Sequence, residues 1–235
     1  MLEKIKAYYR IGLTWTSNAL EGNSLIESET KVLLEDGLTI GGRSLRDVLE
    51  VAAHAKAYGF MFTLLKSRRI DEEMVLYMHR LFYWNIEPDY AGRYRDIQVI
   101  ITGSHYSITP PDRLDKEMRG LFEWAAKVRE RFHPVEFAAE LHRRFVYIHP
   151  FKDGNGKVVR LLMNFALIQD GYLPAVIPPI LRKDYVFLLE RAHREAHDFI
   201  EFIAERELES QKEILRLFQI PFPKMESGMS GMELK

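Results

Sequence analysis

Apolar and polar residues alternate with helical spacing over most of the 235 residues of the chain. In residues 136–148, for example, Phe137, Leu141, Phe145 and Ile148 recur at helical intervals, so they share one face. The same spacing predicts helices over residues 3–21, 28–36, 44–66, 71–83, 112–131, 134–148, 157–170, 182–196 and 199–217. The sequence therefore predicts an all-α protein, a helical bundle.

One segment departs from the helical pattern. Residues 97–109 place β-branched residues on both sides of a Gly-Ser turn and stop at two prolines, which predicts a small β-hairpin. An isolated hairpin needs packing support in a helical protein. At the other end of the pattern, residues 221–235 mix Gly, Ser, Met and charge without periodicity, and we expect a flexible tail there.

Composition narrows the class of protein. The chain is 47% hydrophobic and 29% charged, with a net charge of −1, which predicts a globular protein with no nucleic-acid partner. The absence of cysteine excludes disulfides and thiolate metal sites. The start of the chain lacks the apolar core of a secretory signal, and no apolar run approaches the ~20 residues of a bilayer span. We therefore expect a cytoplasmic protein with no membrane partner.

Residues 149–160 concentrate the candidate chemistry. They read His-Pro-Phe-Lys-Asp-Gly-Asn-Gly-Lys-Val-Val-Arg. His149 is a candidate base, and Asp153 is a candidate metal ligand. The two glycines before a helix allow backbone N–H groups to converge on phosphate. Taken singly, these residues are typical of helix caps and turns, but their combination favours the transfer of a phosphorus group.

This segment resembles the Fic-family signature, His-x-Phe-x-Asp/Glu-Gly-Asn-Gly-Arg-x-x-Arg, with one departure at Lys157. The resemblance implies the Fic fold, with residues 91–220 as its core. It also implies a protein adenylyltransferase that uses ATP and Mg²⁺. In that reaction His149 would deprotonate a Ser, Thr or Tyr hydroxyl of a target protein. The hydroxyl oxygen would then attack the α-phosphate and expel pyrophosphate.

The resemblance further assigns the residues that would hold the nucleotide. Asp153 would bind Mg²⁺, and Asn155 would contact the α-phosphate. The backbone of Gly154 and Gly156 would form an anion hole, while Phe151 would anchor the loop in the core.

Two cations follow on the next helix. Lys157 and Arg160 lie three residues apart, so both side chains can reach the same anion. By resemblance, Arg160 would meet the γ-phosphate. The family usually has arginine at the position of Lys157, and lysine keeps the charge but lacks the planar fork that grips phosphate oxygens. We expect a lower nucleotide affinity for that reason.

The N-terminal region contains a carboxylate in an unfavourable place. If the first helix ends before Gly22, Glu21 lies at the negative end of the helix dipole and requires a cation nearby. Many Fic proteins carry an inhibitory helix with the pattern Ser/Thr-x-x-x-Glu-Gly/Asn, whose glutamate binds the last arginine of the signature. The resemblance thus implies an inhibitory helix around residues 10–22, within an N-terminal helical region of residues 1–90. Glu21 would pair with Arg160, and Ser17 would orient Glu21 or pack beside it.

The resemblance also gives the predicted hairpin a purpose. Fic proteins carry a flap over the active site whose edge pairs with the main chain of the target. The corresponding target-docking residues here are Ile100, Ile101, Thr102 and Gly103. A plain surface excursion is the structural alternative.

Three functions fit these residues. The first is an adenylyltransferase inhibited by Glu21, which we also expect to modify itself. The second is a hydrolase in which Glu21 positions a water to remove AMP from a modified protein. The third is a catalytically silent nucleotide-binding module. The sequence names neither the target protein nor the preferred base, and a homodimer is expected because similar proteins are often dimers.

Overall fold

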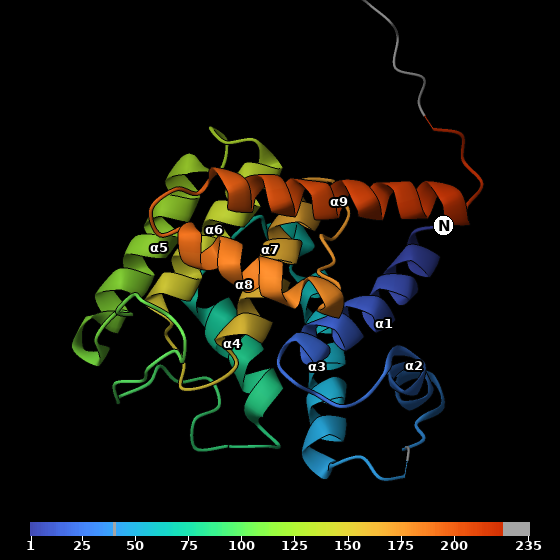
Figure 1. Ribbon diagram of the computed structural model, residues 1–235, viewed down its shortest axis with the longest axis horizontal. Coiled ribbons are helices and arrows are strands. Elements are labelled where there is room, and N and C mark those ends of the chain that lie inside the picture. Colours follow the sequence, from blue (N-terminus) through green and yellow to red (C-terminus); the bar gives the residue numbers. More distant parts are fainter. Residues whose placement is uncertain (40, 223–235) are drawn as a thin grey trace, which may run out of the picture.

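The computed structural model describes residues 1–39 and 41–222 of the chain (Figure 1). Its α-helices, in chain order, are α1 (Leu2–Leu20), α2 (Glu27–Asp36), α3 (Leu45–Thr63), α4 (Glu72–Tyr83), α5 (Leu114–Val128), α6 (Pro134–Ile148), α7 (Asn155–Gln169), α8 (Arg182–Arg191) and α9 (His197–Leu217). Short 3-10 helices lie at Leu65–Ser67, Pro111–Arg113 and Pro179–Leu181. The all-α prediction is confirmed. Of the predicted tail 221–235, residues 223–235 lie outside the described residues.

Local capping sets several helix ends. The Ser44 hydroxyl accepts a hydrogen bond from the backbone N–H of Asp47 at 3.0 Å and starts α3. Asp71 caps α4 in the same way through the N–H of Met74. Gly37 ends α2 in the left-handed conformation, with φ of 69°. These residues satisfy backbone groups that a helix end leaves unpaired, so the turns and the helix starts are specified locally.

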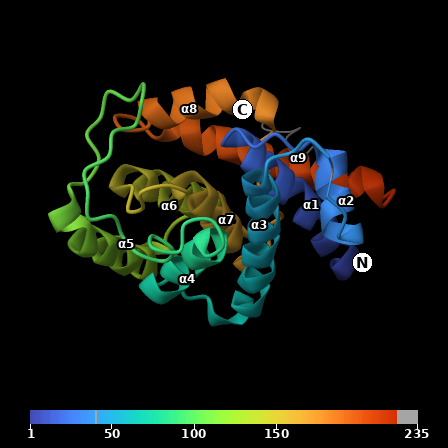
Figure 2. The same ribbon diagram turned by 90° about the horizontal axis from the view of Figure 1, so that it is seen from below.

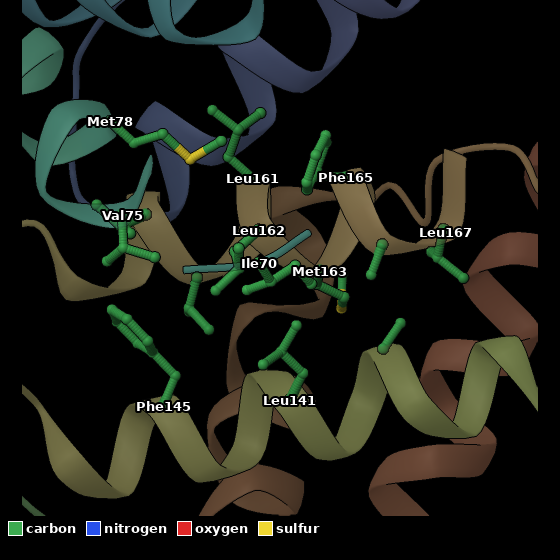
Figure 3. Close-up of a cluster of buried hydrophobic side chains, with 14 of the residues drawn as sticks. Ile70, Val75, Met78, Leu141, Phe145, Leu161, Leu162, Met163, Phe165 and Leu167 are labelled. Atoms are coloured by element: carbon green, nitrogen blue, oxygen red, sulfur yellow. The ribbon is translucent and has the colours of Figure 1, made fainter. Parts of the chain in front are cut away.

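Helices α6 and α7 form the centre of the core. They are joined by the short loop 149–154 and pack along each other. Figure 3 shows Leu141 and Phe145 of α6 beneath α7, with Leu162 of α7 between the helices. Val75 and Met78 reach the same cluster from α4. Full burial of each such side chain contributes about 1.5–3 kcal/mol, so the loop is held between two well-packed helices.

The N-terminal helices bring a distant segment to that loop. Helix α1 packs against α3 and α7, and Figure 2 shows α1, α2 and α3 together on one side of the α6–α7 pair. The Tyr58 hydroxyl of α3 donates to the carbonyl oxygen of Lys6 in α1 at 2.9 Å. The C-terminal end of α1 lies against α7, where Ser17 contacts Arg160. Among the described residues, none of the helices combines the length and apolar character that a membrane span requires.

The predicted β-hairpin over residues 97–109 is wrong. Within the described chain this segment has no strand pairing and forms an extended loop, seen in green beside α8 in Figure 2. It contains one turn, in which the N–H of Ser104 donates to the carbonyl of Ile101 at 3.1 Å. Ile100, in the predicted docking segment, has 89% of its surface exposed.

Side chains take the hydrogen bonds that a hairpin ladder would use. The Arg95 guanidinium donates to the carbonyl of Ile97 at 3.0 Å and also to the carbonyl of Thr109, at the two ends of the loop. The carboxylate of Glu190 in α8 accepts from the Ser104 hydroxyl at 2.9 Å. The loop is therefore closed and anchored by tertiary contacts, which the β-branched composition of the segment does not reveal.

Candidate active site

His149 is the residue at which α6 ends. It adopts the left-handed conformation, with φ of 52° and ψ of 59°, and its N–H donates to the carbonyl of Phe145 at 2.9 Å. This conformation costs a non-glycine residue about 1 kcal/mol or more. Arg95 supports it, because its Nε donates to the His149 carbonyl and its backbone N–H donates to the Pro150 carbonyl, both at 2.9 Å. Arg95 thus ties the loop 97–109 to the start of the active-site loop.

The His149 ring is suited to accept a proton. Burial, and after it the positive charge of Arg95, lowers the pKa of His149 to about 4. The Nδ1 atom is buried and makes no hydrogen bond within the described chain. The imidazole is therefore neutral at pH 7, which is the form that a general base requires.

Phe151 and His79 fix the loop from below. Phe151 is fully buried and stacks on the His79 ring, with ring centroids 3.8 Å apart and nearly parallel planes. The N–H of Gly92 donates to His79 Nδ1 at 2.9 Å, so the ring proton is on Nε2, which lies 3.1 Å from the carbonyl oxygen of Asp153. Sequence reasoning missed His79, although a histidine on the apolar face of α4 was a usable signal.

The glycine-rich turn begins α7 two residues earlier than periodicity predicts, at Asn155 rather than residue 157. Gly154 precedes it with φ of 80°, and a Cβ atom there would collide with the Tyr83 ring. A Cβ atom on Gly156 would collide with the Glu21 carboxylate. The first-turn N–H groups of α7 have no acceptor within the helix, and the Glu21 carboxylate lies against this backbone at Gly156.

The structure gives Asn155 a different partner from the one the resemblance implies. Its Oδ1 accepts from the backbone N–H of Phe151 at 2.9 Å, and its Nδ2 donates to the carbonyl of Phe151 at 2.7 Å. The side chain is also buried. Both ends of the amide therefore close the active-site loop on itself, and neither is directed to a phosphate.

Glu21 and Arg160 lie in contact. A carboxylate oxygen of Glu21 is 2.7 Å from Arg160 Nη2. Ser17 is the second partner of the guanidinium, since its hydroxyl accepts from Nε at 3.0 Å and its carbonyl accepts from Nη2 at 2.9 Å. Ser17 therefore orients the arginine rather than Glu21. Arg160 is buried, whereas the Glu21 side chain is 38% exposed.

The negative end of α1 is balanced by more than one cation. Besides Arg160 on Glu21, the Arg182 Nε donates to the carbonyl of Leu20 at 2.8 Å. A cavity of about 10 Å³ adjoins Ser17, Arg160 and Asn164 between α1 and α7, which is room for about one water molecule. The interface between the two helices is thus nearly closed.

Lys157 points to a separate carboxylate. Its Nζ lies 2.8 Å from Glu50 Oε2 on α3, and only 4% of the lysine side chain is exposed. Glu50 also accepts a hydrogen bond from Asn23 Nδ2 at 3.2 Å. Lys157 and Arg160 therefore hold different glutamates and do not converge on one position in this structure.

Asp153 is the most exposed of the predicted site residues with a charge, at 59%. Its Oδ1 accepts from the N–H of Gly154 at 2.7 Å, and its Oδ2 lies 3.2 Å from Arg46 Nη2. Among the described residues, no cluster of three or more His, Cys, Asp or Glu side chains is arranged for a metal ion. A single accessible carboxylate nevertheless suits Mg²⁺, which binds through one or two carboxylates and takes its other ligands from phosphate and water.

Three further polar residues of the core are engaged with one another or with backbone. Asn164 accepts from the N–H of Ala175 at 2.7 Å. The Tyr185 hydroxyl lies 2.9 Å from His142 Nε2. These contacts tie α7 and α8 to their neighbours and assign none of the three side chains to a nucleotide base.

The site thus combines a buried neutral histidine, an accessible carboxylate and a glycine-rich helix start on a helical scaffold. Residues 69–167 match the model of the Fic/DOC family. This stretch of the chain is a Fic/DOC domain. The chain is 38% identical over 192 residues to the protein adenylyltransferase Fic of Nematostella vectensis, covering 80% of this chain and 44% of that protein. It is 32% identical to the protein adenylyltransferase fic-1 of Caenorhabditis elegans, covering 80% of this chain and 37% of that protein.

Solved structures give the same result. A Fic-1 fragment from C. elegans superimposes with a TM-score of 0.82 at 30% identity, covering 90% of this chain and 64% of that one. A Fic domain containing signaling protein from Bacteroides thetaiotaomicron gives 0.81 at 27% identity, covering 93% and 90%. The chain spans less than half the length of the two curated relatives described above.

Proposed function

We propose that this chain transfers AMP from ATP to a Ser, Thr or Tyr hydroxyl of a target protein, and that Glu21 inhibits the transfer. One observation carries the proposal. A neutral His149 begins the loop that leads into the glycine-rich start of α7, and Arg160 on that helix is held by Glu21 at 2.7 Å. The relatives named adenylyltransferases support the same reaction.

The proposed step uses this chain's own groups in turn. The imidazole of His149 takes the hydroxyl proton while the hydroxyl oxygen forms a bond to the α-phosphorus. The bond from that phosphorus to the bridging oxygen breaks, and pyrophosphate leaves. The N–H groups at the start of α7 stabilise the charge on the α-phosphate oxygens. When bound at Asp153, Mg²⁺ would supply charge neutralisation for the phosphates.

Glu21 inhibits by competing for the cation that the triphosphate needs. Its carboxylate lies over Gly156 and holds Arg160. While the pair persists, a γ-phosphate would meet a like charge and find its arginine occupied. ATP would then bind in a pose unsuited to in-line attack.

The test is mass spectrometry of the purified chain after incubation with ATP and Mg²⁺. We expect Glu21→Gly to gain the mass of one AMP residue faster than the unchanged chain. Glu21→Gln is the matched control, because it removes the charge but keeps a hydrogen-bond acceptor, and it should show an intermediate rate. Release of AMP from a chain already modified, if it is lost in Glu21→Gly, would instead favour the hydrolase, with Glu21 as a catalytic group. No ATP binding by any of the three proteins would favour the silent module.

The proposal extends to partners and location. It includes the chain itself as one target, a homodimer, and a cytoplasmic location. It also keeps Ile100, Ile101, Thr102 and Gly103 as the target-docking segment, now as an exposed loop rather than a hairpin. Light scattering of the purified chain checks the homodimer, and a single-subunit mass would contradict it.

A further inference from the structure

Arg46 bridges α3 and the active-site loop. It lies in the first turn of α3, and its guanidinium contacts carboxylates in three directions. Nε lies 3.1 Å from Glu50, Nη1 lies 3.4 Å from Glu87, and Nη2 lies 3.2 Å from Asp153. The Arg46 side chain is 49% exposed. The Glu87 and Asp153 side chains are themselves 35% and 59% exposed, and exposed ion pairs are weak, so the guanidinium can exchange these two anions for another.

Lys157 does not have that freedom. Its ammonium is buried against Glu50, and removal of one partner from a buried ion pair is strongly destabilising. If a phosphate drew Lys157 away, the Glu50 carboxylate, which is 11% exposed, would lose its closest cation. The Lys157–Glu50 pair therefore behaves as part of the packing between α3 and α7.

From these contacts we infer that Arg46 is a phosphate-binding residue of this site. It binds the phosphates of a nucleoside triphosphate beyond the α-phosphate, while the charge of Lys157 is committed to Glu50. This inference rests on the proposed function. The guanidinium of Arg46 has a planar fork that can bind two phosphate oxygens at once, and lysine lacks this geometry. It also lies within hydrogen-bond distance of Asp153, the carboxylate at which phosphates and metal would meet.

The chain offers a matched control for this arginine. Arg43 precedes α3 and pairs with Glu29 at 2.8 Å, through a guanidinium that is partly exposed. Among the described residues, its hydrogen-bond partner Glu29 lies on α2 and not on α7. Arg43→Gln and Arg46→Gln each remove one positive charge from the same stretch of chain, and they differ in contact with the active-site loop.

The experiment is calorimetric titration with ATP, ADP and AMP in the presence of Mg²⁺, in the Glu21→Gly background. We expect Arg46→Gln to weaken ATP and ADP binding by about tenfold or more, as for the loss of a charge-assisted hydrogen bond, with AMP affinity changed by less than about twofold. Arg46→Lys should lie between. Arg43→Gln should leave all three affinities unchanged.

Several outcomes would overturn the inference. Unchanged ATP affinity in Arg46→Gln would remove Arg46 from the site, and increased affinity would show that Arg46 competes with the ion for Asp153. Equal losses for ATP and AMP would indicate a distorted site instead of a lost phosphate contact. If AMP transfer persists in any of these cases, the proposed function stands. Failure of the Glu21→Gly protein itself to bind ATP would overturn both.

Discussion

Arg160 and Lys157 are neighbouring cations of α7, and each is paired with a glutamate from a different N-terminal helix. The pairs are alike in length, at 2.7 Å for Glu21–Arg160 and 2.8 Å for Glu50–Lys157. They differ in the glutamate. The Glu21 side chain is 38% exposed, whereas that of Glu50 is 11% exposed.

The surroundings of the two carboxylates explain what this difference means. Glu21 follows the last residue of α1, and its carboxylate accepts a hydrogen bond from Arg160. Glu50 lies inside α3 and is also bonded by Arg46 and Asn23. A carboxylate at an exposed helix end can turn into water, and Ser17 then still holds Arg160, whereas Glu50 is fixed inside its helix by several donors. The Glu21–Arg160 pair is therefore suited to open, whereas the Glu50–Lys157 pair is suited to hold α3 against α7.

The largest expected effect is the loss of AMP transfer when His149 is replaced in a protein whose Glu21–Arg160 pair has been opened. In the Glu21→Gly background, His149→Ala should lower AMP transfer by about 10²–10⁴-fold, because the acceptor hydroxyl loses its general base. ATP affinity should stay nearly unchanged, since the imidazole is assigned to the hydroxyl and not to the phosphates. Transfer assays and titration calorimetry measure the two quantities. Retained transfer would sink the assignment of His149 as the base.

The second prediction concerns the stability that the Glu50–Lys157 pair provides. Glu50→Gln should lower the free energy of unfolding by about 3–5 kcal/mol, because it leaves the buried ammonium of Lys157 without a negative partner. Glu21→Gln should cost less, about 1.5–3 kcal/mol for the loss of a charge-assisted contact, because the hydroxyl and carbonyl of Ser17 still hold Arg160. Urea unfolding of the two variants gives the comparison directly. Equal losses would mean that the two pairs are not different in kind.

A third prediction separates the roles of Glu21 and Arg160 in AMP transfer. Glu21→Gly should raise AMP transfer by about ten- to a hundredfold, the shift expected from release of a charge-assisted contact of about 1.5–3 kcal/mol. Arg160→Ala combined with Glu21→Gly should not show that rise, because the arginine itself is needed for the γ-phosphate. Initial rates with ATP and Mg²⁺ give the result. A double variant as active as Glu21→Gly would contradict the role of Arg160.

The smallest effect concerns pH. Burial lowers the pKa of His149 to about 4, so the neutral base persists as the pH falls from 7 to 5 and is lost only as the pH passes through about 4. In the Glu21→Gly protein, kcat/KM should therefore change by less than about twofold between pH 7 and pH 5. An acid limb with a midpoint near 6.5, the ordinary histidine value, would show that the ring is not desolvated in the active form.

The same pKa has a consequence for stability. In the unfolded chain His149 titrates near its ordinary value of about 6.5, so between that pH and about 4 the unfolded state binds more protons than the folded state. Stability is therefore fully present above pH ~6.5 and declines as the pH falls toward 4. A flat unfolding free energy across this window, measured in urea, would contradict the buried neutral ring.

Local rules explain why so much of the fold follows from the sequence. The 3.6-residue spacing that places Leu141 and Phe145 on one face acts within a helix, and so do caps such as Ser44 and Asp71. The predicted hairpin over residues 97–109 failed because the side chains of Arg95 and of Glu190 on α8 bind its polar groups, and the β-branched pattern carries no signal for either contact.

The site shows the same division. Its base, loop and helix start come from one continuous segment, residues 149–160, and are readable as a pattern. Of the charge partners, the resemblance implies only Arg160 for Glu21, and the others cannot be read from this segment. His79 on the Asp153 carbonyl, Glu50 on Lys157 and Arg46 on Asp153 all join segments distant in sequence. A pattern in one segment carries no information on such partners.

The sequence by itself thus determined the helical class, the identity of the chemical groups in residues 149–160, and an unbalanced carboxylate at Glu21. The tertiary structure alone decided which cation each carboxylate meets and which pair is exposed. The physical reason is that periodicity and capping are short-range, whereas burial and ion pairing depend on the packing of α1 and α3 against α7. Lys157 and Arg160 lie three residues apart in the sequence, and only that packing gives one a buried partner and the other a releasable one.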